Sequence, residues 1–277
     1  MIDQHTDLYG VVGYPLGHTL SPIMHNTAFQ ASRLNAVYLA FETKDIDDCL
    51  RGMKALGIKG LSVTLPFKSR VIPLLDDVDN QAKRIGAVNT IVNDNGRLKG
   101  YNTDAIGILK SLEEEVIDLS DRKCLLIGAG GAARAIGFTL KERGIELTIA
   151  NRSIGSGEKL AESLGSPFVP LKDIEKIKAD LIVQATPVGM YPHTDQCLIP
   201  ETLLKEGPVV MDIIYNPIET KVLKLARDYG CKRVSGLSMF IHQGGEQFRL
   251  WTGFEPPLKE MTSSVKEALR DRSSERN

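Results

Sequence analysis

The sequence has few of the features that mark secreted, metal-binding or redox-active proteins. It contains only four cysteines, Cys49, Cys124, Cys197 and Cys231, and no two of them form a C-x-x-C pair. Its five histidines show no spacing typical of metal ligands. We therefore expect no disulfide, no zinc site and no other metal, and the free thiols favour a reducing, cytoplasmic location.

Charge and hydropathy argue against nucleic-acid-binding, membrane and secreted proteins. The 34 Lys and Arg residues nearly balance the 35 Asp and Glu residues, so no net field favours nucleic acid or an anionic membrane. No apolar run approaches the roughly 20 residues that span a bilayer. The first ten residues lack the basic and apolar regions of a signal peptide. The expected partners are small molecules, and the expected state is a monomer or a homodimer.

The first hundred residues alternate between strand-like and helix-like segments. Residues 9–15, 36–42 and 60–64 are rich in apolar and β-branched side chains and are typical of strands. Ser21 and Pro22 are the expected N-cap and first residue of a helix. Strands that alternate with helices in this way predict a largely parallel sheet covered by helices.

From about residue 104 the pattern starts again. Residues 123–127 form an apolar strand, and a glycine turn, a helix and further strands follow it. The last stretch is amphipathic and helical. We therefore predict an α/β fold with two domains: a mostly parallel α/β substrate domain in 1–104, a Rossmann-type domain in 105–237, and C-terminal helices in 238–277 that return to the first domain.

The glycine turn "IGAGGAARA" fits the pattern G-x-G-x-x-[GA], with Gly128, Gly130 and Ala133 at the fixed positions. A strand precedes it and a helix follows it at once. Backbone N–H groups and a helix N-terminus in this arrangement bind a pyrophosphate. The alternative is a strand-to-helix turn with no ligand.

The end of the next strand indicates which dinucleotide binds. An NAD site usually has Asp or Glu there to bind the ribose 2′-hydroxyl, but this chain has Asn151, Arg152 and Ser153. A guanidinium and a hydroxyl suit a 2′-phosphate, so NADP is the expected cofactor. The alternative is an arginine that is merely exposed in a loop.

A lysine follows the strand 60–64 in an unusual place. Thr64 lies where the strand leaves the sheet, which is where open parallel sheets bind ligands. Pro66 then stops any ladder, and Lys68 comes two residues later. A helix that begins near Phe67 would place Lys68 in its first turn. Lys68 either reaches a ligand or is a solvated surface lysine.

Other polar residues lie at the expected strand and helix ends. Asp104 precedes a helix, so it is either an N-cap or a carboxylate that holds Lys68 in the same cleft. Asn89 and Asn102 can bind hydroxyls or close turns. Thr19 and Ser21 place two hydroxyls beside the first N–H groups of a helix, which suits a carboxylate, although Ser21 can also be only an N-cap.

Nine short motifs, in this order across about 240 residues, resemble the shikimate dehydrogenase family. They are "HTLSP", "SVTLPFK", "GAVNT", "GYNTD", "GAGGAARA", "ANRS", "ATPVGM", "DIIYNP" and "HQGGEQFRLWTG". The resemblance implies the reversible reduction of 3-dehydroshikimate to shikimate with NADPH (EC 1.1.1.25), in the biosynthesis of aromatic amino acids through chorismate. It implies no metal.

The resemblance also assigns residues. It makes Lys68 and Asp104 the catalytic pair, with the Lys68 ammonium supplying a proton to the ketone oxygen. The substrate-binding residues that it implies are Thr19, Ser21, Thr64, Lys68, Asn89, Asp104, Tyr215 and Gln243. The cofactor-binding residues that it implies are Gly128, Ala129, Gly130, Gly131, Ala132, Asn151, Arg152, Ser153, Ile213 and Gly236.

Three residues depart from the family pattern. Thr19 replaces a serine, Ser62 stands where many members have asparagine, and Ser156 replaces a second arginine, with Lys159 as a helper for the 2′-phosphate. A quinate/shikimate dehydrogenase that also uses NAD therefore remains an alternative. So do a catalytically silent dinucleotide sensor and another two-domain NADP enzyme, such as a methylenetetrahydrofolate dehydrogenase.

Overall fold

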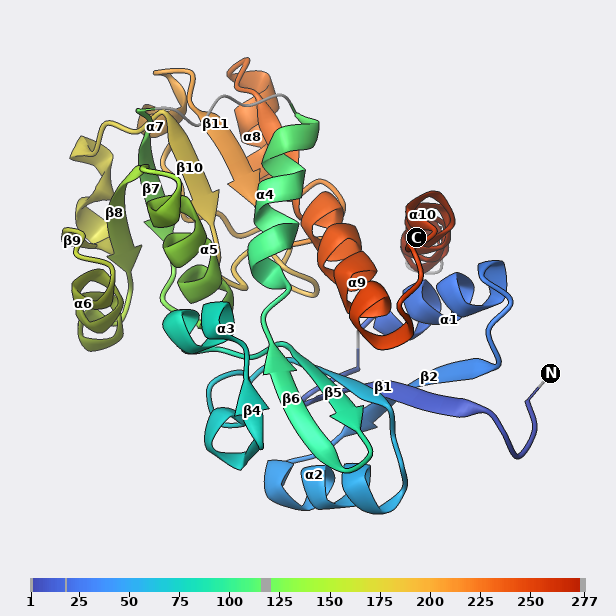
Figure 1. Ribbon diagram of the computed structural model, residues 1–277. Helices are drawn as coiled ribbons and strands as arrows, with labels where there is room; N and C mark the ends of the chain where they lie inside the picture. Colours follow the sequence, from blue (N-terminus) through green and yellow to red (C-terminus); the bar gives the residue numbers. More distant parts are fainter. Residues whose placement is uncertain (1, 18, 116–120, 275–277) are drawn as a thin grey trace. The chain divides into compact units, whose positions relative to one another are not determined.

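The computed structural model describes residues 2–17, 19–115 and 121–274 (Figure 1). The chain divides into two compact units: one runs up to Ile106 and resumes at Ile241, and the other is Gly107–Phe240. Helices α4 (Asp104–Glu114) and α9 (Gly236–Thr252) each begin in one unit and end in the other. Each unit contains a sheet covered by helices, which confirms the predicted α/β class with C-terminal helices in the first unit.

The sheet of the first unit has the strand order β2-β1-β3-β5-β6-β4. Strands β2, β1 and β3 run parallel, β5 runs antiparallel to β3 and β6, and β4 runs parallel to β6. The strands are β1 (Asp7–Gly13), β2 (Ala36–Glu42), β3 (Gly60–Val63), β4 (Asp77–Val78), β5 (Thr90–Asp94) and β6 (Arg97–Tyr101).

Helices cover both faces of this sheet. On one face, α2 and α3 pack over an apolar cluster that includes Leu50, Met53 and Leu61. On the other face, α1 and α9 meet the strands through aromatic rings: Phe29 of α1 lies 5.1 Å from Tyr9 of β1 and 5.7 Å from Phe248 of α9 between ring centroids. Helix α10 packs against α1 (Figure 1). The helices are α1 (Ser21–Ala31), α2 (Ile46–Ala55), α3 (Asn80–Ile85), α10 (Leu258–Ser274) and the 3₁₀ helix Ile72–Leu74.

Two local predictions in this unit are wrong. Ser21 is the first residue of α1, and Leu20 is its N-cap. The hydroxyl that serves the helix start is that of Thr19, which accepts a hydrogen bond from the Ser21 backbone N at 3.3 Å. No helix begins near Phe67 either, because the chain makes turns through Lys68 and Val71 before the 3₁₀ helix.

The sheet of the second unit is entirely parallel, with the order β12-β11-β10-β7-β8-β9. Read from β9, this is the doubly wound order 3-2-1-4-5-6 of dinucleotide-binding domains. The strands are β7 (Lys123–Ile127), β8 (Glu146–Asn151), β9 (Phe168–Pro170), β10 (Leu181–Gln184), β11 (Val209–Asp212) and β12 (Arg233–Ser235). The helices are α5 (Gly131–Glu142), α6 (Ile154–Ser163), α7 (Glu201–Leu204), α8 (Lys221–Asp228) and the 3₁₀ helix Leu171–Lys176.

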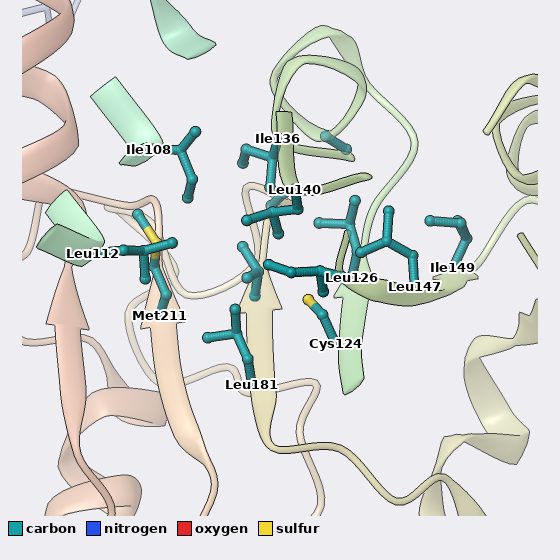
Figure 2. Packing of buried hydrophobic residues seen from close by; sticks show 14 of the residues in the cluster. Ile108, Leu112, Cys124, Leu126, Ile136, Leu140, Leu147, Ile149, Leu181 and Met211 are labelled. Carbon is teal, nitrogen blue, oxygen red and sulfur yellow. The ribbon is translucent and has the colours of Figure 1, made fainter. Parts of the chain in front are cut away.

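Strands buried on both faces explain the continuous apolar runs of this unit. Figure 2 shows one face, where Ile136 and Leu140 of α5 pack against Leu126 of β7. The neighbouring residues Leu125 and Ile127 belong to the apolar cluster of the opposite face. In the described part of the chain, no helix is both long enough and apolar enough to cross a bilayer. The four cysteines are free thiols.

Candidate functional site

Lys68 and Asp104 form an ion pair in the first unit. Lys68 follows β3 on a turn, Asp104 begins α4, and Lys68 Nζ lies 2.5 Å from Asp104 Oδ2. The side chain of Lys68 is 15% exposed and that of Asp104 is 7% exposed. Water therefore screens this pair far less than the ion pairs on the surface. The structure brings together the two residues predicted to form the catalytic pair.

Asn102, rather than Asp104, caps the start of α4. Asn102 Oδ1 accepts hydrogen bonds from the backbone N of Asp104 at 3.1 Å and of Ala105 at 3.4 Å. The alternative that Asp104 is the N-cap is therefore wrong. Because the side chain of Asn102 takes that role, the carboxylate of Asp104 is available to bind other groups.

Asn89 is the second partner of Asp104. Its Nδ2 donates to Asp104 Oδ1 at 2.8 Å, while Lys68 binds the other carboxylate oxygen. Asn89 Oδ1 accepts a hydrogen bond from the backbone N of Thr103 at 2.8 Å. Gln243 Oε1 lies 3.5 Å from Asn89 Nδ2. Four of the predicted substrate-binding residues thus gather at one place in the first unit.

The remaining predicted substrate residues lie near other element ends. Thr19 and Ser21 have their hydroxyl oxygens 3.2 Å apart at the start of α1. Thr64 follows β3 directly, and its backbone N donates to Val12 O at 3.0 Å. Tyr215 lies in the second unit, where its ring stacks on that of Phe240 with centroids 4.2 Å apart.

The glycine turn of the second unit fits a pyrophosphate. Gly128 directly follows β7 and has a φ of 125°, and a Cβ there would lie 2.7 Å from Ala185 O, so only glycine fits. Gly130 is the N-cap of α5, and a Cβ there would meet no atom within 4 Å. The N-terminus of α5, with Ala129, Gly131 and Ala132 around it, therefore opens onto free space, where a phosphate can reach the backbone N–H groups.

Asn151, Arg152 and Ser153 lie at the end of β8, as the sequence predicts. Asn151 Nδ2 donates to Ser153 O at 2.9 Å and to Ser156 Oγ at 2.8 Å, which fixes the turn into α6. Arg152 is exposed, and in the part of the chain that the structure describes no carboxylate pairs with it. An unpaired guanidinium beside a helix start suits a 2′-phosphate.

Ile213 and Gly236 touch each other through their backbones. A Cβ on Gly236 would lie 2.3 Å from both the carbonyl carbon and the oxygen of Ile213, so the close approach requires glycine. Ile213 follows β11 and Gly236 begins α9. These two predicted cofactor residues are thus neighbours at the carboxyl edge of the parallel sheet, where doubly wound folds bind dinucleotides.

Asp212 is a buried carboxylate that the sequence analysis did not identify. It is fully buried and accepts hydrogen bonds from Thr220 Oγ1 at 2.6 Å, the Ile214 backbone N at 3.0 Å and Gln184 Nε2 at 3.4 Å. Burial raises the pKa of Asp212 to about 6, although these hydrogen bonds lower it in part. An aspartate at the end of the apolar run "VVMD" was the signal that could have revealed it.

We predict that Asp212→Asn gains stability relative to the wild type as the pH rises from about 4 to about 6. In this window the folded wild type keeps a proton on Asp212 that the unfolded chain releases, so its free energy of unfolding falls with pH. In the asparagine variant Oδ1 can still accept from Ile214 and Gln184, while the NH2 group can donate to the Thr220 hydroxyl, and the pH dependence is lost. The difference in free energy of unfolding between the variant and the wild type should change by about 1.4 kcal/mol per pH unit at most. Urea unfolding across this range measures it, with Asp173→Asn as the exposed control; a constant difference contradicts the prediction.

His25 is a second buried titratable residue. Its ring is fully buried, stacks on Tyr38 with centroids 4.4 Å apart, and has Nε2 3.3 Å from Gln247 Oε1. Burial lowers the pKa of His25 to about 3, so the ring is neutral. Within the described residues, no group of His, Cys, Asp and Glu side chains is arranged to hold a metal ion.

Models of known protein families match most of the chain. The model of the shikimate dehydrogenase substrate binding domain matches residues 11–91. The model described as shikimate / quinate 5-dehydrogenase matches residues 110–230, and that of the shikimate 5′-dehydrogenase C-terminal domain matches residues 236–266. These matches follow the order of the motifs along the sequence.

Individual proteins are similar over nearly the whole chain. A shikimate dehydrogenase (NADP(+)) of Moorella thermoacetica is 44% identical, over 95% of this chain and 94% of its own. A solved shikimate dehydrogenase in complex with NADP+ is 40% identical with a TM-score of 0.92, and the match covers 97% of this chain and 98% of that one. The Thermus thermophilus enzyme, solved with NADP(H) and shikimate, is 37% identical with a TM-score of 0.88, over 95% and 99%.

Proposed function

The chain belongs to the shikimate dehydrogenase family, and we propose that it catalyses the reversible NADPH-dependent reduction of 3-dehydroshikimate to shikimate. The family resemblance of the sequence motifs is thereby confirmed. The observation that carries the proposed reaction is the weakly screened pair of Lys68 and Asp104, whose atoms lie 2.5 Å apart. An ammonium and a carboxylate at this distance can donate and recover the proton that the reduction of a ketone requires.

Lys68 holds the proton for the reaction. In the reduction, we infer that its ammonium donates a proton to the ketone oxygen of the substrate and becomes a neutral amine as the alcohol forms. Asp104 keeps the amine in position through its Oδ2, and the NH2 group of Asn89 keeps the carboxylate in position by donating to Asp104 Oδ1. In the oxidation, the neutral Lys68 takes the proton of the substrate hydroxyl.

The substrate is assigned to polar groups of the first unit. The hydroxyls of Thr19 and Ser21, at the start of α1, are proposed to bind its carboxylate, since helix-start N–H groups favour an anion. Thr64, Asn89, Asp104 and Gln243 are proposed to bind its ring hydroxyls. Tyr215 is the one substrate residue assigned to the second unit.

The cofactor is assigned to the carboxyl edge of the second sheet. The Gly128 turn and the N-terminus of α5 are proposed to bind the pyrophosphate, and Asn151, Arg152 and Ser153 the 2′-phosphate. Ile213 and Gly236 are proposed to line the nicotinamide side. Bound NADPH supplies the hydride, and NADP+ accepts it in the reverse direction.

The rival functions find less support. The similar proteins named above are shikimate dehydrogenases that use NADP, which favours this reaction over a quinate enzyme that uses NAD. A silent sensor has no need for a proton-transfer pair such as Lys68 and Asp104. We further propose that the protein is cytoplasmic, in keeping with its four free thiols, and acts as a monomer or a homodimer.

A rate assay tests the proposed function. The purified protein is expected to oxidise shikimate with NADP+, measured by the absorbance of NADPH, with a higher kcat/KM than for shikimate with NAD+. Quinate with either cofactor should give a lower kcat/KM still. A preference for quinate and NAD+ would establish the rival dehydrogenase, and no turnover with any pair would favour the sensor.

A further inference from the structure

A row of buried polar side chains leads from helix α9 to the ion pair. Its members are Gln247 on α9, Thr90 at the start of β5, Asn89 and Asp104, and each of these residues as a whole is at most 5% exposed. All of them lie in the first unit. Buried polar groups are costly unless each one has a partner, so such a row is stable only as a fully connected network.

The hydrogen bonds of this row have a fixed direction. Gln247 Nε2 donates to Asn89 O at 3.2 Å and to Thr90 Oγ1 at 3.0 Å, which uses both of its hydrogens. The single hydroxyl hydrogen of Thr90 is then donated to Asn89 Oδ1 at 2.8 Å. Together with the backbone N of Thr103, which donates to the same oxygen at 2.8 Å, this hydroxyl makes Asn89 present its NH2 group to Asp104 Oδ1.

The far end of the row fixes the orientation of Gln247 itself. Gln247 Oε1 accepts a hydrogen bond from Ser62 Oγ at 2.8 Å, and Ser62 Oγ accepts one from Tyr38 OH at 2.6 Å. His25 Nε2 lies 3.3 Å from the same Gln247 oxygen. Because Ser62 donates to Oε1 and the backbone carbonyl of Asn89 can only accept, the amide of Gln247 must turn its NH2 group toward Thr90.

We propose that Thr90 and Gln247 are positioning residues for proton transfer: they orient the Asn89 amide, which holds the Asp104 carboxylate against Lys68. Neither residue is assigned to the substrate, the cofactor or the proton, and both act through Asn89. The inference rests on the proposed function, because the pair that it positions is the proposed proton-transfer pair. The competing explanation is that the row only packs α9 onto the sheet.

Two substitutions of Thr90 separate these explanations. Thr90→Val keeps the volume of the side chain and removes the hydroxyl, whereas Thr90→Ser keeps the hydroxyl and removes a methyl group. If the hydroxyl positions Asn89, Thr90→Val should lower kcat for shikimate about tenfold or more, while Thr90→Ser keeps kcat within about twofold of the wild type. The KM for NADP+ should not change in either variant, since the assigned cofactor residues lie in the other unit.

The urea midpoint of unfolding distinguishes a packing role from a positioning role. Thr90→Ser leaves a small cavity and should lower the urea midpoint without lowering kcat. If packing alone matters, kcat should instead follow the urea midpoint in both variants. That result would overturn the inference.

Gln247→Met, which is close in volume, breaks the row at its other end and decides the question if Thr90→Val fails to fold. Its matched control is Trp251→Phe. Trp251 Nε1 donates to Ile91 O at 3.0 Å and so also ties α9 to β5, but outside the row. Gln247→Met should lower kcat about tenfold, and Trp251→Phe should not. The double variant Thr90→Val/Gln247→Met should lose no more kcat than the more impaired single variant, because the row is already broken.

The wild type distinguishes a failure of this inference from a failure of the proposed function. A wild type that does not oxidise shikimate with NADP+ would reject both. An active wild type whose Thr90→Val and Gln247→Met variants keep near-normal kcat would reject the positioning role alone. An active wild type whose Thr90→Val and Gln247→Met variants lose kcat about tenfold, while Thr90→Ser and Trp251→Phe do not, supports it.

Discussion

Lys68→Ala is expected to lower kcat for shikimate oxidation about a hundredfold or more and to leave the KM for shikimate nearly unchanged. The ammonium contributes chiefly when the proton moves, so its loss affects the transition state more than the bound substrate. Initial rates of NADPH formation at saturating NADP+ measure both constants. Urea unfolding of the same sample is needed as well, because the variant leaves Asp104 buried without its cation.

Lys54→Ala is the matched control for this prediction. Lys54 Nζ lies 2.8 Å from Asp76 Oδ2 in the same unit, and both side chains are about 40% exposed. Lys54→Ala therefore also breaks an ion pair between a lysine and an aspartate, but one at the surface. It should keep the kcat of the wild type. A folded Lys68→Ala variant with turnover close to that of the wild type would remove Lys68 from the mechanism.

Patterns that repeat along the chain allowed the fold class to be predicted. The apolar strand 123–127 and the glycine turn after it belong to a unit whose geometry is nearly fixed by local sequence. Gly128 illustrates this, because its φ of 125° is a backbone conformation that favours glycine. The glycine motif is therefore enough to predict the strand, turn and helix around it.

Local hydrogen-bond competition was harder to predict. Several polar side chains near the start of α1 and of α4 can accept hydrogen bonds from the first backbone N–H groups of the helix. Helix propensity does not decide which of them does so. At α1, the hydroxyl of Thr19 accepts from the Ser21 backbone N, so Ser21 is not the cap. At α4, Asn102 takes the backbone N–H groups, and Asp104 turns its carboxylate to Lys68.

Contacts between distant segments left no signal in the sequence. Gln247 is separated from Asn89 by 158 positions, and nothing in "HQGGEQF" distinguishes its role from that of Gln243. The difference arises from helical geometry. The two residues lie one turn apart on α9, and Gln247 reaches the backbone of Asn89 while Gln243 lies near its amide. Ser62 was noted only as a departure, and it proves to be a partner of Gln247.

Ser156 shows how a departure from a family pattern can be part of the local structure. Its hydroxyl accepts a hydrogen bond from Asn151 Nδ2 and donates to Ser153 O at 3.2 Å. Ser156 therefore stabilises the turn that carries Arg152. Unlike an arginine at this position, it adds no second positive charge for the 2′-phosphate. For this reason we expect binding of the 2′-phosphate to depend mainly on Arg152.

Arg152→Ala should raise the KM for NADP+ about ten- to a hundredfold and change the KM for NAD+ less than about twofold. A charge-assisted hydrogen bond to a phosphate contributes about 1.5–3 kcal/mol, and NAD+ lacks the 2′-phosphate that would receive it. Initial rates of shikimate oxidation with each cofactor at saturating shikimate measure both constants. The variant should fold normally, because Arg152 is exposed and no described carboxylate pairs with it.

Two further variants make this test specific. Arg143→Ala removes an exposed arginine at the opposite end of α5 and should leave both KM values unchanged. Lys159→Ala removes an exposed lysine of α6 that we propose as a second, weaker partner of the 2′-phosphate, and it should raise the KM for NADP+ less than Arg152→Ala does. Equal increases for NADP+ and NAD+ in Arg152→Ala would mean that the guanidinium binds a part of the dinucleotide common to both, and the 2′-phosphate would then have to be recognised elsewhere.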